Sequence, residues 1–219
     1  MITERFSLFF KGLEHNNTKQ WFHANTKAYE TDVKAPFLRL LEEILPNLMD
    51  WDPRILPNPK KALFRINRDI RFTKDKSPYT TILKAGCAPG GRKSELPGYY
   101  LGIDAANVHV GGGLFMLQPS KLKKVRLHIA AHPGRLCKIV ASSEFKETFG
   151  RLQGEKSKRL EKTLLPAAEK TDLIYHKQFY AFTEFPLAPF YGSDALTDTI
   201  LEHLQVIKPL NDYLNEALI

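Results

Sequence analysis

Cysteine is scarce in this 219-residue chain, which contains only Cys87 and Cys137 and has no Cys-x-x-Cys pair. Thiolate zinc sites are therefore excluded, and two reduced thiols are expected, with a single disulfide as the alternative. No stretch approaches the about 20 apolar residues of a membrane span. The apolar residues near the N-terminus are too few, and too soon followed by charge, for a signal peptide. We therefore expect a cytoplasmic protein without a membrane partner.

The common nucleotide-binding and hydrolase motifs are also missing. The segment 86–94, GCAPGGRKS, differs from a phosphate-binding P-loop because Arg92, and not lysine, follows Gly91. The Pro97-Gly98 pair also prevents a helix just beyond it. No Gly-x-Gly-x-x-Gly opens a helix, and no Gly-x-Ser-x-Gly elbow occurs. Dinucleotide folds and serine hydrolases of these types therefore find no support.

Two histidines, His128 and His132, are spaced as metal ligands on a helix could be. However, no glutamate follows His128, and Pro133 comes directly after His132. We therefore predict no metal site at this pair. An aspartate and the phosphates of a substrate can hold Mg²⁺ without any motif, so the sequence names no cofactor.

What the chain does have is an excess of positive charge. Lys and Arg outnumber Asp and Glu by 32 to 24, which gives a net charge of +8. This excess favours an acidic partner, although an ordinary basic protein explains it equally well. Between Asp104 and Glu144 there is no acidic residue. Six basic residues fall in that segment, and such a helix face is commonly just solvated: Lys121, Lys123, Lys124, Arg126, Arg135 and Lys138.

The order of hydrophobic patterns predicts an α+β fold. Helical spacing precedes residue 50 and returns after Ser193, whereas a period of two begins at Ala62. Strands are expected at residues 62–67, 79–87, 98–104, 107–117 and 177–185. We predict a single domain over residues 1–219, in which N-terminal and C-terminal helices pack on a mainly antiparallel central sheet.

Prolines and glycines predict local features of these elements. Pro36 is expected to end or kink the helix that precedes it, and Pro209 to bend or split the last helix. The run Gly111–Gly113 has no side chains to pack within its strand. It therefore predicts a β-bulge or a close approach of another backbone.

Charge is most concentrated within FRINRDIRFTKDKSPY, residues 64–79. We call residues 65–76 the basic loop. It holds five cations and two carboxylates: Arg65, Arg68, Arg71, Lys74 and Lys76, with Asp69 and Asp75. Arginine binds phosphate or carboxylate through two parallel hydrogen bonds, and lysine adds a point charge. The loop is therefore a candidate binding site for an anionic ligand.

The first hypothesis is a binding domain, or an enzyme, for a small molecule that bears a phosphate or a carboxylate. The anion would be held by Arg65, Arg68, Arg71 and Lys76. Asp75 or Asp69 would act as a general base or orient the arginines. The pocket would be lined by Tyr79, Tyr100 and Arg126. The sequence does not decide whether the domain catalyses a reaction. It also does not decide the oligomeric state.

Two alternatives are open. The chain could bind nucleic acid through its positive charge, with an affinity that falls steeply with salt. Alternatively, the loop could have a purely structural role in an interaction domain. Asp69 would then pair with Arg71, and Asp75 with Arg68.

The segment FRINRDIRFTKDKSPY is similar to the domain of unknown function 2461 family of bacterial and fungal proteins. The resemblance extends over nearly the whole chain, including LEHNNTKQWFHANTKAYETDVKAPF and the strands GYYLGID and VHVGGGLF. It implies a single domain without an established activity. The family motif falls on Arg68, Asp69, Arg71, Phe72, Asp75, Lys76, Pro78 and Tyr79. Lys177 matches a family lysine before the late strand, whereas the family's Pro-x-Gly-[Tyr/Phe] loop is missing here.

Overall fold

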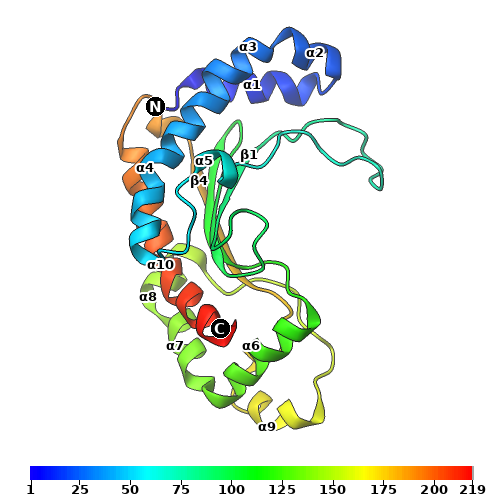
Figure 1. Ribbon diagram of the computed structural model, residues 1–219, viewed down its shortest axis with the longest axis vertical. Helices are drawn as coiled ribbons and strands as arrows, with labels where there is room; N and C mark the ends of the chain where they lie inside the picture. Colours follow the sequence, from blue (N-terminus) through cyan, green and yellow to red (C-terminus); the bar gives the residue numbers. More distant parts are fainter. Residues whose placement is uncertain (219) are drawn as a thin grey trace. The chain divides into compact units, whose positions relative to one another are not determined.

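The computed structural model describes residues 1–218, and its strands form one four-stranded sheet in the order β1-β2-β3-β4. The strands are β1 (Leu83–Cys87), β2 (Gly98–Ile103), β3 (Asn107–Leu114) and β4 (Phe179–Pro186). Strands that are neighbours in the sequence are also neighbours in the sheet, which is antiparallel. With helices on either side of the strands in the sequence, the predicted α+β fold is confirmed (Figure 1).

Helices precede the sheet, separate β3 from β4, and follow β4. The first group is α1 (Glu4–His15), α2 (Lys19–Ala24), α3 (Thr26–Ala28), α4 (Ala35–Trp51) and α5 (Pro59–Ala62). A π-helix, Tyr29–Lys34, joins α3 to α4. The second group is α6 (Pro119–Ala131), α7 (Pro133–Ala141), α8 (Ser143–Phe149) and α9 (Leu165–Ala168). The chain then ends in α10 (Ala195–Leu218).

The chain divides into two compact units. The first contains Met1–Arg92, Tyr100–Val110 and Glu184–Leu201. The second contains Lys93–Tyr99, Gly111–Thr183 and the residues from Glu202 onward. The basic loop lies entirely in the first unit, and helices α6 to α9 lie in the second. The prediction of one domain over residues 1–219 stays a prediction.

Aromatic packing organises the helices of the first unit. Phe9 of α1 lies with its ring centroid 5.5 Å from Trp21, 6.2 Å from Phe22 and 5.7 Å from Tyr29. The spacing of Phe6, Phe9 and Leu13 places all three on the buried face of α1. Burying such aromatic side chains removes large apolar areas from water, which stabilises the helices against one another.

The two prolines do not interrupt the helical segments that contain them. The π-helix Tyr29–Lys34 leads directly into α4, in which Pro36 lies in the first turn, so Pro36 does not end the helical segment. Similarly, α10 continues through Pro209 as one helix. The predicted end at Pro36 and the predicted split at Pro209 are therefore wrong, whereas the alternatives, a kink at Pro36 and a bend at Pro209, stay predictions.

The glycine run allows a close approach of strand β4 to strand β3 in the second unit. A Cβ atom on Gly111 would lie 2.1 Å from the carbonyl oxygen of Ala181. A Cβ atom on Gly113 would lie 2.1 Å from the carbonyl oxygen of Phe179. Gly113 also has a φ of +113°, a conformation that favours glycine. The predicted close backbone approach is confirmed.

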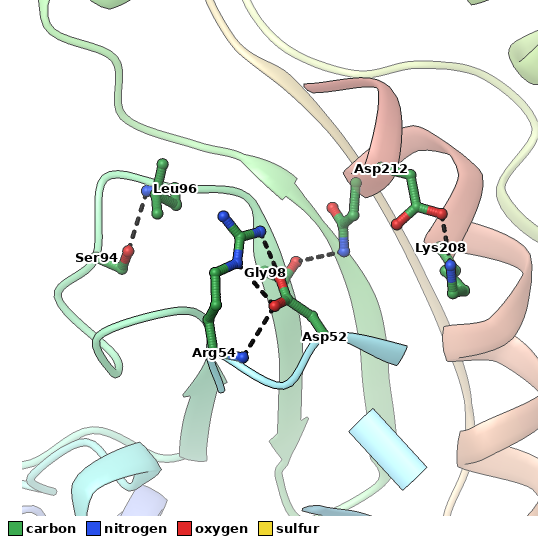
Figure 2. A network of polar contacts seen from close by, with 8 residues as sticks. Asp52, Arg54, Ser94, Leu96, Gly98, Lys208 and Asp212 are labelled. Carbon is green, nitrogen blue, oxygen red and sulfur yellow. Dashed lines mark hydrogen bonds and ion pairs between the residues drawn. The ribbon is translucent and has the colours of Figure 1, made fainter. Parts of the chain in front are cut away.

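Helix α10 packs against Gly112, the middle residue of this run, which also has no side chain. A Cβ atom on Gly112 would lie 3.3 Å from atoms of both Ile207 and Asn211. The amide of Asn211 donates a hydrogen bond of 3.2 Å to the carbonyl oxygen of Gly98 at the start of β2 (Figure 2). Within the second unit, the last helix is thus held against the sheet by packing and by a polar contact.

Candidate functional site

The two segments that flank the basic loop pair with each other in the first unit. Phe64 donates from its backbone N–H to the carbonyl oxygen of Lys84 at 2.8 Å. Thr80 donates in the same way to Ile66, also at 2.8 Å. Figure 1 shows the loop as a long excursion of the chain just before β1. The paired segments thus fix the two ends of an extended loop.

The two segments do not pair as a regular strand ladder. The predicted strands at 62–67 and 79–87 are therefore corrected. Only isolated bridges occur before β1, and the regular strand begins at Leu83. Pro78 has no N–H to donate. The hydroxyl group of Thr80 donates to the carbonyl oxygen of Ile82 at 2.9 Å, which competes with ladder bonding. The predicted alternation of sides holds at residues 65–67, where Ile66 is buried and Arg65 and Asn67 are exposed, but not at Leu63 and Phe64, which are both half-buried.

Tyr79 anchors the C-terminal end of the loop to the N-terminal helices. Its backbone N–H donates to the side chain of Asn17 at 3.1 Å, and its carbonyl oxygen accepts from the same amide at 3.0 Å. Its ring is stacked on Phe22, with centroids 4.1 Å apart and an interplanar angle of 16°. Tyr79 is only 4% exposed. The geometry therefore gives its ring a packing role, and its predicted place in a ligand pocket stays a prediction.

Asp75 closes the loop across seven residues. One carboxylate oxygen forms an ion pair and hydrogen bond with Arg68, and the other accepts from the backbone N–H of Ser77 at 2.9 Å. Hydrogen bonds from Ser77 and from Arg68 lower the pKa of Asp75 below its ordinary value. The carboxylate is thus held ionised and in a defined orientation.

Asp69 forms a second, more local ion pair. It accepts from Nε and from a terminal nitrogen of Arg71 at 2.9 and 2.6 Å, in a two-point arrangement. These bonds lower the pKa of Asp69. The same Asp-x-Arg pairing occurs between Asp52 and Arg54, where the corresponding distances are 2.8 and 2.7 Å (Figure 2). The spacing of two residues therefore produces this pair without any ligand.

The other cations of the loop differ in their surroundings. Lys76 donates to the carbonyl oxygen of Ile70 at 2.9 Å, which ties the two sides of the loop together. Arg65 and Lys74 are exposed, and neither has an ion pair within residues 1–218. The positive charge of Arg65 contributes to the lowered pKa of Asp69. The two carboxylates thus neutralise only part of the loop's charge.

The remaining predicted residues lie outside the loop. Tyr100, on β2 in the first unit, is half-buried, and burial raises its pKa to about 12. In the second unit, a terminal nitrogen of Arg126 donates to the hydroxyl of Ser157 at 2.7 Å and to the carbonyl oxygen of His176 at 3.2 Å. Arg126 thus leans toward the protein and ties α6 to the segment before β4.

Lys177 also has a partner within its own unit. Its ammonium group lies 3.2 Å from a carboxylate oxygen of Glu155. Since Arg126 and Lys177 belong to the second unit, they do not join the basic loop within one compact unit. Their predicted contact with the same ligand stays a prediction.

Two residues that the sequence analysis assigned no role in the site are brought forward by the structure. Phe72 is 92% exposed, and the guanidinium carbon of Arg71 lies 5.6 Å from the centroid of its ring. Asn17 acts as a polar anchor for Tyr79. A phenylalanine within a run of charged residues was an available signal for Phe72. No signal for Asn17 exists without knowledge of which segment meets Tyr79.

One described hollow lies in the second unit. It has a volume of about 740 Å³ and is lined by α7, α8 and α10. Its apolar part includes Ile139, Val206 and Pro209. Lys208, also part of its lining, donates to Asp212 at 2.5 Å (Figure 2). No residue of the basic loop lines this hollow or the small hollow of the first unit, whose lining includes Ile2, Leu40 and Leu196.

The described residues also bear on metal sites, reactive thiols and membrane-spanning helices. No group of three or more His, Cys, Asp and Glu side chains within residues 1–218 is arranged to hold a metal ion. Cys87 and Cys137 are both free thiols, and burial raises the pKa of Cys87 to about 12, so its thiol is unreactive at neutral pH. No helix among these residues combines the length and apolar character that crossing a bilayer needs.

Comparison with known protein families identifies a relationship. A family model described as a conserved hypothetical protein (DUF2461) matches residues 5–213, a range that includes the basic loop and all four strands. No curated protein matches the sequence.

Proposed function

The chain belongs to the DUF2461 family of conserved hypothetical proteins, and on that premise we propose that it binds ligands bearing phosphate or carboxylate groups through the basic loop. The family description names no activity. The observation that carries the proposal is the unbalanced charge of the loop. Five cations accompany two carboxylates, and both carboxylates are already engaged inside the loop. The remaining positive charge is exposed and favours an anionic partner.

The ion pairs of the basic loop leave unused N–H donors as well as positive charge that is not neutralised. A guanidinium group has five N–H donors, and Arg71 uses two of its side-chain nitrogens on Asp69. The side chain of Arg71 is 74% exposed, so its remaining donors are accessible. Arg65 and Lys74 add two exposed cations. A phosphate or carboxylate can accept from such groups in charge-assisted hydrogen bonds.

The two aspartates are better suited to orient arginines than to accept protons. Hydrogen bonds lower the pKa of both Asp69 and Asp75. A carboxylate with a lowered pKa is a weaker base, whereas a general base works best with a pKa near the working pH. We therefore assign Asp69 and Asp75 the role of holding Arg71 and Arg68 in place.

The test uses a double variant that removes exposed charge without touching either ion pair, Arg65→Gln with Lys74→Gln. Calorimetry against inorganic phosphate, nucleotides and sugar phosphates should show binding by the wild-type chain. Since a charge-assisted hydrogen bond contributes about 1.5–3 kcal/mol, the double variant should bind at least about tenfold more weakly. A matched control, Lys11→Gln with Lys27→Gln, removes the same charge from exposed positions on α1 and α3.

Equal weakening in the double variant and the control would show a general charge effect and contradict the assignment to the loop. Absence of binding to every anion would contradict the proposal itself. The structural alternative is distinguished by Asp75→Ala. If the motif only maintains the fold, this variant should unfold. If the proposal is correct, it should stay folded, because the Asp75–Arg68 pair is exposed, and lose affinity for the anion.

A further inference from the structure

We propose that the anionic ligand of the basic loop is a single-stranded nucleic acid, and that Phe72 stacks on one of its bases. The inference rests on the proposed anion binding and narrows it to one class of ligand. Its starting point is the exposure of Phe72, which is 92%, the highest value among the exposed large hydrophobic side chains of residues 1–218.

An exposed aromatic residue by itself is unremarkable on a protein surface. The surroundings of Phe72 are what distinguish it. The guanidinium group of Arg71 lies over its ring, and the sequence around it contributes Lys74 and Lys76. An aromatic ring among cations is the combination by which proteins hold single strands, since bases stack on the ring while cations contact the phosphates.

The form of the loop also points to a polymer. The loop is an extended excursion of the chain (Figure 1), and residues 71–76 are all exposed. Small ligands are usually enclosed by concave sites. An extended, exposed loop offers few contacts to a single phosphate, whereas a chain with many phosphates can meet several of its cations at once. Repeated anionic groups are therefore the better match.

The aromatic ring selects a single strand over a duplex. In a duplex the faces of the bases are covered by their neighbours, whereas unstacked bases of a single strand present free faces to aromatic side chains. Polyanions without bases, such as inorganic polyphosphate, can use the cations but cannot stack on Phe72. The ring is thus the group that separates nucleic acid from other polyanions.

An anionic membrane surface is the competing partner, because cations beside an exposed apolar side chain also suit a bilayer interface. The neighbours of Phe72 weigh against it. Arg71 lies over the ring and is paired with Asp69. Insertion of the ring among acyl chains would bring this ion pair close to hydrocarbon, where charged groups are costly. Stacking a base requires no such transfer.

The experiment measures fluorescence anisotropy of labelled single-stranded 15-mers of DNA and RNA, of the corresponding duplexes, and competition by inorganic polyphosphate. The proteins are the wild-type chain, Phe72→Ala, Phe72→Leu, Phe72→Tyr and the Arg65→Gln/Lys74→Gln double variant. Because base stacking on one aromatic ring changes affinity by about 5- to 150-fold, Phe72→Ala and Phe72→Leu should weaken single-strand binding by that factor. Phe72→Tyr should retain it, and polyphosphate binding should not change in any Phe72 variant.

The outcomes separate this inference from the proposed function. If the double variant weakens polyphosphate binding but Phe72→Ala leaves the single-strand affinity unchanged, anion binding stands and the stacking inference is wrong. If Phe72→Leu binds as tightly as the wild type, the ring does not stack. Preferential, Phe72-dependent binding to phosphatidylserine vesicles would assign the loop to a membrane instead. If neither polymer binds, the inference of a single-stranded ligand is wrong, whereas the proposed function fails only if the small anions of the calorimetric test do not bind either.

Discussion

At the scale of single residues, Asn17 connects two segments that are distant in the sequence. Its amide both donates to and accepts from the backbone of Tyr79, as a neighbouring strand would. Asn17 near the N-terminus and Tyr79, which follows the basic loop, are therefore parts of one contact. This contact fixes where the loop ends.

Replacing Asn17 should destabilise the first unit. Asn17→Ala removes two hydrogen bonds and leaves a part-buried N–H and carbonyl of Tyr79 without these partners. We expect the free energy of unfolding to fall by about 1–3 kcal/mol, as for other polar groups left unsatisfied, when measured by urea denaturation. Asn16→Ala is the control, since Asn16 is exposed and donates only to Gly12. An equal loss in both variants would contradict the anchoring role.

Contacts between single residues were predictable when the two residues lie close together in the sequence. The pair Asp69–Arg71 was a stated alternative, and the same spacing produces the same geometry at Asp52 and Arg54. A local pair of this kind is encoded by the order of two residues. The contact of Asn17 with Tyr79 spans 62 residues, so it depends on how separate elements meet and could not be predicted from local pattern.

At the scale of elements, the glycine run determines how closely β3 and β4 approach. Gly113→Ala would bring a Cβ atom to 2.1 Å from the carbonyl oxygen of Phe179, and would place alanine at a φ of +113°. Overpacking of this kind costs about 1–3 kcal/mol, and the unfavourable φ adds to it. We therefore expect a loss of at least about 2 kcal/mol in urea denaturation.

The matched control for this substitution lies in a helix of the same unit. Gly134→Ala, near the start of α7, would place its Cβ in open space. Since alanine favours a helix over glycine by up to about 1 kcal/mol, this variant should be as stable as the wild type or slightly more stable. A destabilisation of Gly134→Ala equal to that of Gly113→Ala would show that glycine at 113 is not specifically required.

Elements were predictable where a strong local period existed and uncertain where side chains compete for backbone groups. Strands β3 and β4 were predicted because their residues alternate clearly, whereas β2, in which residues 101–103 are all buried, was predicted without such an alternation. The predicted strand at 62–67 is present only as isolated bridges, since Pro78 cannot donate and the Thr80 hydroxyl bonds to Ile82. The predicted end at Pro36 and the predicted split at Pro209 do not occur, because a proline's effect depends on its position in a helix.

At the scale of the whole molecule, the sequence predicted the charge but not which side chains are paired or exposed. The net charge of +8 and the composition of the basic loop can be counted from the sequence. Which cations bond to other parts of the fold cannot, because Arg126 donates to the Ser157 hydroxyl 31 residues away and Lys177 pairs with Glu155 22 residues away. The exposure of Phe72 was equally inaccessible, since local spacing does not say which aromatic residues the core leaves out.

The pH dependence of stability is also a property of the whole chain, and buried histidine determines its direction near neutrality. His176 is 3% exposed, and burial, followed by the charge of Lys156, lowers its pKa, although Asp172 acts in the opposite direction. The folded chain therefore binds fewer protons than the unfolded chain below the ordinary histidine pKa of about 6.5. It follows that the free energy of unfolding should fall as the pH drops through this range.

Urea denaturation at pH 7.5 and pH 5.5 tests this expectation above the range in which aspartates with lowered pKa titrate. The wild type should be less stable at pH 5.5, and His176→Gln should lose less stability between the two pH values, although its stability at pH 7.5 is also reduced. The dependence should not vanish, because His128, which faces His132, Arg135 and Glu216, also has a lowered pKa. His23→Gln, at an exposed position on α2, should keep the wild-type difference. An unchanged difference in His176→Gln would mean that His176 is accommodated in its charged form within the second unit.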